Sequence, residues 1–402
     1  MFELNKFINK YVIKRPYSMF LEDIERNKEK LMKKIQGKSV LVIGGAGSIG
    51  SSYIKAILPF KPKTLVVVDI NENALAELTR DLRSTRGLYV PEDFIPYPMD
   101  FASATFEKMF RKRGGFDVVA NFSAHKHVRS EKDIFSIEAL LQNNVLHAKI
   151  LLDLLEEYPP EEYFCVSTDK AANPVNIMGA SKRIMEDVIF SYSDKFPVKT
   201  ARFANVAFSN GSLPAGFLAR ISKLQPLSAP SDVKRYFVSP EESGQICMLA
   251  CMLGKNREIF FPKLADAQMM TFDTIARELL HEQGFDVLEC QTDEEAIEKA
   301  EYLKQGSKQY PVHFSSSNTS GEKPFEEFYT DTEKVDMDRL NALGVIVDKE
   351  LTDRDKIETL FAELNHEFGK MEPTKSEVVQ IIKDYLPNFE HIETGKSLDS
   401  KM

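Results

Sequence analysis

The feature that most constrains the fold is a series of short apolar runs, rich in β-branched residues, that begins near residue 39. The runs occupy residues 39–45, 64–70, 116–124, 163–170 and 198–207. Each is nearly continuous in apolar character, as is typical of strands that are covered on both faces of a parallel sheet. Intervening stretches such as residues 72–84 repeat apolar residues with the period of a helix, about 3.6 residues. We therefore predict an α/β fold built on a doubly wound parallel sheet.

Changes in this pattern divide the 402 residues into four regions. We expect a charge-rich helical extension over residues 1–36 and the doubly wound domain over residues 37–207. Loops rich in Gly, Pro and Ser then follow, and such loops often carry ligand contacts. We therefore expect a smaller substrate-binding region over residues 208–365 that returns in part to the core. A helix and a tail would complete the chain over residues 366–402.

Composition and charge narrow the class of protein. Lys and Arg number 52 against 61 Asp and Glu, for a net charge of -9, and no stretch gathers the basic residues, so we expect no nucleic-acid partner. The four cysteines lack the close, even spacing of a disulfide framework, which indicates a reducing compartment. The N-terminal stretch lacks the apolar block of a signal peptide, and nowhere do about 18 apolar residues run together. We expect a cytoplasmic protein without a membrane span.

A glycine-rich loop, GGAGSIG at residues 44–50, follows the first apolar run directly and opens a helical stretch. Glycines at Gly44, Gly47 and Gly50 let the backbone turn tightly and approach a pyrophosphate. The charge of that group would rest on the amides at the helix start, at Ser48 and Ile49. The alternative is a glycine-rich turn without a ligand. The strand, loop and helix setting favours a Rossmann-type dinucleotide site.

Two acidic residues follow the next two strand-like runs. Asp69 lies 19 residues after Gly50, where a carboxylate accepts hydrogen bonds from the adenine ribose and repels a 2'-phosphate. Because residues 70–73 supply no Arg or Lys, we expect NAD and not NADP as the cofactor. Asp100 is placed either to meet the adenine amine or to cap the helix that follows, and the two roles can coexist.

A hydroxyl, a carboxyl and an amine lie together at the end of the fourth run, as Thr168, Asp169 and Lys170. Open α/β sheets bind their ligands at the carboxyl ends of the strands, so these three side chains form a candidate acid–base set. The alternative for Thr168 and Asp169 is the capping of a turn or helix. A helix should then carry Met178 and Lys182, which are one turn apart and share a face.

These motifs resemble those of the extended short-chain dehydrogenase/reductases, and within them the UDP-N-acetylglucosamine 4,6-dehydratases of bacterial polysaccharide biosynthesis. The resemblance covers most of residues 37–330 and rests on GGAGSIG (44–50), SAHKHV (123–128), STDKAANPVNIMGASKR (167–183), RFANVAFSNGS (202–212), KRYF (234–237) and GEKPFEE (321–327). The usual Tyr of the family's Tyr-x-x-x-Lys pair is Met178 here, and a branch of the 4,6-dehydratases similar to this sequence shares that Met. The resemblance implies NAD binding by residues 37–207 and sugar-nucleotide binding by residues 208–365.

In the reaction that the resemblance implies, NAD takes a hydride from sugar C4 and returns one to C6. Lys170 would remove the C5 proton, and a protonated Asp169 would give its proton to the departing C6 hydroxyl. Lys182 would bind the nicotinamide ribose. The proton of the C4 hydroxyl would leave through Thr168 together with a lysine or water, and the residues do not decide between these two.

The resemblance also implies which residues bind the UDP-sugar substrate. Those residues are Lys126, His127, Asn205, Asn210, Ser212, Arg235 and Glu326, with Ala124 beside the cofactor. An internal turn is the alternative for residues 210–212, and a surface salt bridge is the alternative for Arg235. We expect no metal at His125 and His127, because no carboxylate or Cys shares their spacing. We expect a homo-oligomer, and the rival functions are a sugar-nucleotide 4-epimerase and a non-catalytic NAD-binding scaffold or sensor.

Overall fold

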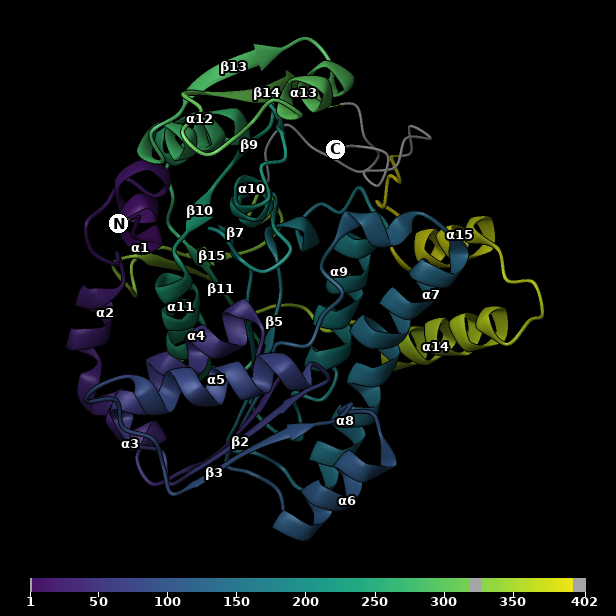
Figure 1. Cartoon of the computed structure of the whole chain (residues 1–402). Coiled ribbons are helices and arrows are strands. Elements are labelled where there is room, and N and C mark those ends of the chain that lie inside the picture. Colours follow the sequence, from purple (N-terminus) through teal and green to yellow (C-terminus); the bar gives the residue numbers. More distant parts are fainter. Residues whose placement is uncertain (1, 318–326, 393–402) are drawn as a thin grey trace.

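The structure is a computed structural model that describes residues 2–317 and 327–392 (Figure 1). At its centre is a sheet with the strand order β15-β16-β11-β6-β5-β4-β1-β2-β3. The strands from β11 to β3 are parallel, whereas β16 runs antiparallel to β11 and β15 antiparallel to β16. The doubly wound parallel sheet predicted from the apolar runs is confirmed.

The strands of the sheet are β1 Ser39–Ile43, β2 Thr64–Asp69, β3 Asp93–Pro98, β4 Val118–Asn121, β5 Glu162–Val166, β6 Val198–Ala201, β11 Glu258–Pro262, β15 Val335–Asp336 and β16 Leu343–Ile346. Ile43 pairs with Asn121, Asn121 with Cys165, and Cys165 with Thr200. Because these partners are level, the carboxyl ends of β1, β4, β5 and β6 lie side by side. This edge of the sheet positions the site.

Helices cover both faces of the sheet and bury its β-branched side chains. One face packs against α3 Lys28–Ile35, α4 Ser48–Ile57, α5 Glu72–Ser84 and α11 Pro240–Leu253. The other packs against α6 Ala104–Arg113, α7 Ile134–Leu141, α8 His147–Glu157 and α9 Ile177–Phe190. The pattern of apolar residues over 72–84 predicted α5 with these same bounds.

A smaller unit lies beyond the carboxyl edge (Figure 1). Its parallel sheet, in the order β13-β14-β8, consists of β13 Asp286–Cys290, β14 Gln309–Ser315 and β8 Leu227–Pro230. Its helices are α10 Leu213–Ser222, α12 Phe272–Glu282 and α13 Asp293–Ala300, and the short strands nearby are β7 Asn205–Val206, β9 Lys234–Arg235, β10 Phe237–Val238 and β12 Met270–Thr271. Phe7 and Val12, from α1 Leu4–Phe7 and the π-helical turn Ile8–Val12, enter its core, so the N-terminal extension buttresses this unit.

Further along the extension, α2 Leu21–Arg26 and α3 lie beside the main sheet, into whose core Phe20 and Leu31 are buried. At the other end of the chain, α14 Arg354–Phe368 and α15 Lys375–Tyr385 pack together outside α9 (Figure 1). The boundary expected between residues 365 and 366 therefore falls inside α14. In the described part of the chain, none of the helices has the length and apolar character needed to span a bilayer.

Candidate active site

A cavity of about 780 Å³ opens where the carboxyl edge of the main sheet faces α10 and β8. Ten of the residues predicted for the site or its surroundings line it: Ile49, Ala124, Lys126, His127, Thr168, Lys170, Met178, Lys182, Asn205 and Ser212. Among the described residues, nine others predicted for the site stay outside that lining: Gly44, Gly47, Ser48, Gly50, Asp69, Asp100, Asp169, Asn210 and Arg235. Glu326 lies outside the described residues. The cavity thus brings together residues that follow β4, β5 and β6 and residues of α4, α9 and α10.

The glycine loop forms one end of this region, between β1 and α4. Gly44 has a φ of +69°, and a Cβ there would lie 2.6 Å from the backbone N of Ser123. A Cβ on Gly50 would lie 2.4 Å from the carbonyl oxygen of Gly44, so only glycine fits either position. Gly47 is the N-cap of α4, and the first amides of a helix have no partner within it. The loop can therefore hold an anion such as a pyrophosphate at the positive end of α4.

Asp69, at the end of β2, is fixed beside the glycine loop. One carboxylate oxygen accepts a hydrogen bond from the Ala46 amide at 3.0 Å, and the other accepts from the Asn71 amide at 2.9 Å. These bonds orient the carboxylate at the sheet edge, where a ribose beside the loop can reach it.

Asp100 follows β3, and one of its two predicted roles is wrong. The helix α6 starts at Ala104, and its N-cap is Ser103, whose Oγ accepts a hydrogen bond from the Phe106 amide at 3.2 Å. Asp100 lies three residues before that cap and accepts from the Ala102 amide at 2.9 Å. The chain makes one more turn after β3 than we expected, so Asp100 shapes the turn and does not cap the helix.

The trio after β5 forms a compact hydrogen-bonded group. Asp169 is 4% exposed, and its Oδ1 accepts from the Thr168 hydroxyl at 2.7 Å and from the Lys170 amide at 2.9 Å. The Lys170 ammonium lies 3.4 Å from the same oxygen. All three groups donate to the same carboxylate oxygen. Asp169 itself does not line the cavity, but it is hydrogen-bonded to Thr168 and Lys170, whose side chains do.

The helix that follows the trio, α9, is capped by a residue outside the trio. Asn176 is the N-cap of α9, and its Oδ1 accepts from the Gly179 amide at 2.7 Å. Within the described chain, the Thr168 side chain makes no cap hydrogen bond to the 3-10 turn that it precedes. The capping alternative is therefore wrong for Thr168, whose hydroxyl is directed to Asp169.

Helix α9 presents Met178 and Lys182 to the cavity. Lys182 is 3% exposed, and its Nζ donates to the carbonyl oxygen of Val166 at 3.0 Å. Burial lowers the pKa of Lys182, while the neighbouring Cys165 and Glu186 act in the opposite direction. The side chain is thus held at the end of β5, beside the trio.

The residues after β4 are tied to α9 by Asn144, which sequence reasoning missed. Its Oδ1 accepts from the His125 amide at 2.9 Å, and its Nδ2 donates to the His125 carbonyl at 2.9 Å and to the Ser181 hydroxyl at 3.0 Å. Next in the chain, Lys126 donates to the Asn210 carbonyl at 2.9 Å, and burial lowers the pKa of Lys126. This turn connects the main sheet to the loop that precedes α10.

The far wall of the cavity starts at α10. Ser212 caps this helix, its Oγ accepting from the Ala215 amide at 3.4 Å, and the helix start lines the cavity. Arg220, two turns along, also lines the cavity and donates to the Gly216 carbonyl at 3.2 Å. Sequence reasoning missed Arg220, although its position on a helix that follows a Ser-capped start could have indicated it.

Arg235 and Asn210 have different settings from those of the cavity-lining residues. Arg235 is 6% exposed and donates to the carbonyl of Lys234 at 2.9 Å, so its side chain is buried and does not lie on the surface. Asn210 is exposed in the turn before α10, and its backbone N–H donates to the Ser48 hydroxyl at 2.9 Å. That bond ties the turn to the glycine loop.

Comparison with known proteins matches residues 40–345 to the family described as polysaccharide biosynthesis protein. The uncharacterized membrane protein MJ1061 of Methanocaldococcus jannaschii is 33% identical over 256 residues, which are 62% of this chain and 73% of that protein. EpsC of Bacillus subtilis, a probable polysaccharide biosynthesis protein, is 28% identical over 342 residues, or 83% of this chain. The match covers 54% of EpsC, so this chain spans about half the length of that relative.

Enzymes with assigned reactions are also among the relatives. A UDP-N-acetylglucosamine 4,6-dehydratase (inverting) of Campylobacter jejuni is 25% identical over 303 residues, which are 73% of this chain and 82% of that enzyme. UDP-glucose 4-epimerases of Rickettsia species are similar as well. The solved structure of Pen from Bacillus thuringiensis has a TM-score of 0.62 at 19% identity and covers 82% of this chain and 98% of its own, which shows a common fold.

The family match runs from β1 into β16 and includes the glycine loop, the trio and α9. The resemblance to the extended short-chain dehydrogenase/reductases, drawn from those same motifs, is confirmed. This chain belongs to the polysaccharide biosynthesis protein family.

Proposed function

We propose that this protein is an NAD-dependent 4,6-dehydratase that acts on UDP-N-acetylglucosamine and makes the 4-keto-6-deoxy sugar nucleotide. The observation that carries the proposal is the single cavity in which Thr168, Lys170 and Lys182 meet, with Met178 on the helix face where a proton-relaying Tyr is usual. Membership in a polysaccharide biosynthesis family and similarity to a 4,6-dehydratase support the same reaction.

The residues around the glycine loop fit NAD. The space that a Cβ on Gly44 or Gly50 would fill lets the backbone approach a pyrophosphate, and Asp69 offers a carboxylate to the ribose and disfavours a 2'-phosphate. Lys182 would hold the second ribose at the end of β5. Bound there, NAD would supply a hydride acceptor for sugar C4 and a hydride donor for C6.

The trio supplies the acid and the base. Lys170 removes the C5 proton once its amine is neutral. Asp169, once it carries a proton, passes a proton to the departing C6 hydroxyl through the hydroxyl of Thr168, which lines the cavity. Both conditions are met by moving one proton across the 3.4 Å contact from the Lys170 ammonium to the Asp169 carboxylate. The resting ion pair and the working pair therefore differ by one internal proton transfer.

The remaining walls bind the substrate. Lys126, His127 and Asn205 face the sugar, while the start of α10 and Arg220 take the negative charge of the diphosphate. In this proposal Arg235 bridges the charge of the diphosphate, and Glu326 meets the ribose of the nucleotide. A 4-epimerase would need neither an acid nor a base at Asp169 and Lys170 for elimination, and it normally uses the Tyr that Met178 replaces.

The first prediction tests the reaction directly. Incubation of the protein with UDP-N-acetylglucosamine should give a product lighter by one water in mass spectrometry. Lys170→Met should lower this rate about 100-fold to 10,000-fold because the C5 base is lost, while the protein still releases NAD on denaturation. Lys223→Met, at the end of α10, is the matched control and should keep the wild-type rate.

Other outcomes identify the rivals. An isomer of unchanged mass would show a 4-epimerase. No conversion by the NAD-loaded protein would point to a scaffold or sensor, and a Lys170→Met variant with more than about a tenth of the wild-type rate would exclude Lys170 as the base.

A further inference from the structure

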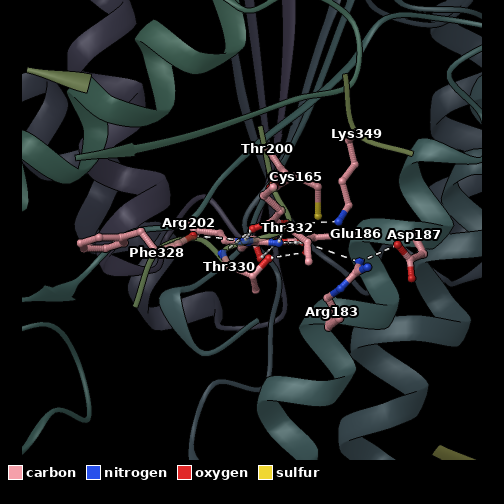
Figure 2. Close-up of polar contacts among 12 residues, drawn as sticks. Cys165, Arg183, Glu186, Asp187, Thr200, Arg202, Phe328, Thr330, Thr332 and Lys349 are labelled. Carbon is pink, nitrogen blue, oxygen red and sulfur yellow. Dashed lines mark hydrogen bonds and ion pairs between the residues drawn. The ribbon is translucent and has the colours of Figure 1, made fainter. Parts of the chain in front are cut away.

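A buried ion cluster around Arg202 and Glu186 lies between the end of β6 and α9 (Figure 2). Its centre is Arg202, whose side chain is fully buried just after β6. The guanidinium donates to Glu186 at 2.8 and 2.7 Å, to Glu333 at 2.8 and 2.9 Å, and to the Phe328 carbonyl at 3.1 Å. All five of its N–H groups therefore have acceptors. Such a fork holds its partners in one geometry.

Glu186 connects this cluster to the site. It accepts a hydrogen bond from the Ser167 hydroxyl at 2.7 Å, and Ser167 lines the cavity directly before Thr168. Glu186 also lies on α9, four residues after Lys182, so the two side chains share a face of the helix. One carboxylate is thus bound to the strand end that carries the trio and is a neighbour of the cavity-facing lysine.

Two arginines, Arg202 and Arg183, stabilise the negative charge of Glu186. Burial by itself raises the pKa of Glu186, but Arg202 and Arg183 outweigh it and hold the pKa below its usual range. Arg183 lies 3.9 Å from Glu186 and pairs with Asp187 at 2.5 Å. Glu186 therefore stays ionised inside the protein.

A negatively charged neighbour favours the ammonium form of the buried Lys182. It shares the cavity with Lys170, and in the proposed reaction Lys170 must become neutral while Lys182 keeps its charge. Burial lowers the pKa of Lys182, and the titratable groups that face it are Cys165 on β5 and Glu186 on its own helix. Burial raises the pKa of the Cys165 thiol, which stays uncharged. Glu186 is therefore the ionised neighbour of Lys182, whereas the carboxylate beside Lys170 is Asp169, which takes up the proton of Lys170 in the proposed reaction.

We propose that Glu186, anchored by Arg202, is a positioning residue that keeps Lys182 in its ammonium form and seats Ser167, and with it the trio, at the cavity. This inference rests on the proposed function. Arg202, Glu186 and Glu333 are not among the described residues that line the cavity, so the cluster acts through Ser167 and Lys182.

The test compares two carboxylates on one guanidinium. Glu186→Gln removes the charge beside Lys182 and keeps the size of the side chain. Glu333→Gln is the matched control, because it removes a carboxylate from Arg202 but contacts neither Ser167 nor α9 in the described structure. Glu186→Asp keeps the charge and serves as the conservative rescue.

We expect the alkaline limb of the kcat profile, where Lys182 loses its proton, to move down by about one pH unit or more in Glu186→Gln. The limb should stay in place in Glu333→Gln and return toward the wild-type position in Glu186→Asp. Both Gln variants should melt at lower temperature, so stability alone would not separate them. If the alkaline limb of the kcat profile lies at the same pH in Glu186→Gln and Glu333→Gln, the inference is wrong.

Retention of NAD, measured against pH by dialysis and release on denaturation, gives a second readout that needs no substrate. The pH at which NAD is lost should fall in Glu186→Gln and not in Glu333→Gln. If that shift occurs but no water is lost from UDP-N-acetylglucosamine, the proposed reaction fails and the role of Glu186 stands. If water is lost normally but neither readout shifts, the role of Glu186 fails and the reaction stands.

Discussion

Glu333 offers a measurement of how much the buried ion cluster stabilises the fold. Its side chain is 7% exposed and binds Arg202 and, at 3.2 Å, the Lys349 ammonium. Burial by itself raises the pKa of Glu333, but Arg202 and Lys349 outweigh it and lower the pKa from 4.5 to about 2. A carboxyl with a depressed pKa in the folded state contributes stability above its unfolded pKa and loses it as the pH falls toward the folded value.

The size of this contribution follows from the two pKa values. Between about pH 6 and about pH 3, a shift from 4.5 to about 2 should remove about 2 kcal/mol of the free energy of unfolding. Glu333→Gln has no such proton to take up. The stability difference between the wild-type protein and this variant should therefore shrink by about 2 kcal/mol over that range.

Urea denaturation followed by circular dichroism at several pH values provides the assay. Glu372→Gln, on an exposed stretch before α15, controls for the loss of a carboxylate as such and should parallel the wild-type protein. A difference between the wild-type protein and Glu333→Gln that stays constant from about pH 6 to about pH 3 would refute the reasoning. The pairing with Arg202 would then contribute no pH-dependent stability.

Two further predictions concern the glycine loop and the wall of the cavity formed by α10. Gly50→Ala should abolish the retention of NAD and lower the thermal stability, because its Cβ would lie 2.4 Å from the Gly44 carbonyl oxygen; bound nucleotide measured after denaturation checks this, and normal retention would contradict it. Arg220→Met should raise the KM for UDP-N-acetylglucosamine about 10-fold or more with little change in kcat, because a contact to a charged group is worth roughly 1.5 to 3 kcal/mol in binding. Steady-state kinetics beside Lys223→Met decide this case, and equal KM values in the two variants would remove Arg220 from the diphosphate site.

Local pattern in the sequence was sufficient for the main sheet and much of the site. Apolar runs placed five strands, and a parallel sheet brings the carboxyl ends of its strands to one edge, so Thr168, Lys170 and Lys182 could be expected to meet. Gly44 and Gly50 were identified because their spacing reflects a close backbone approach that any side chain would block. These features depend on residues near one another in the chain, where periodicity and spacing carry the information.

Contacts between distant segments were decided only by the tertiary structure. Arg202 meets the Phe328 carbonyl 126 positions away and Glu333 131 positions away, and no local pattern marks these partners. Asn144 binds His125 and Ser181 only because a helix and a strand end pack together. Asp100 failed as a helix cap because one extra turn separates β3 from α6. A buried polar group must find whichever partner the packing brings within hydrogen-bonding distance, and that choice is made by the whole fold and not by its neighbours in the sequence.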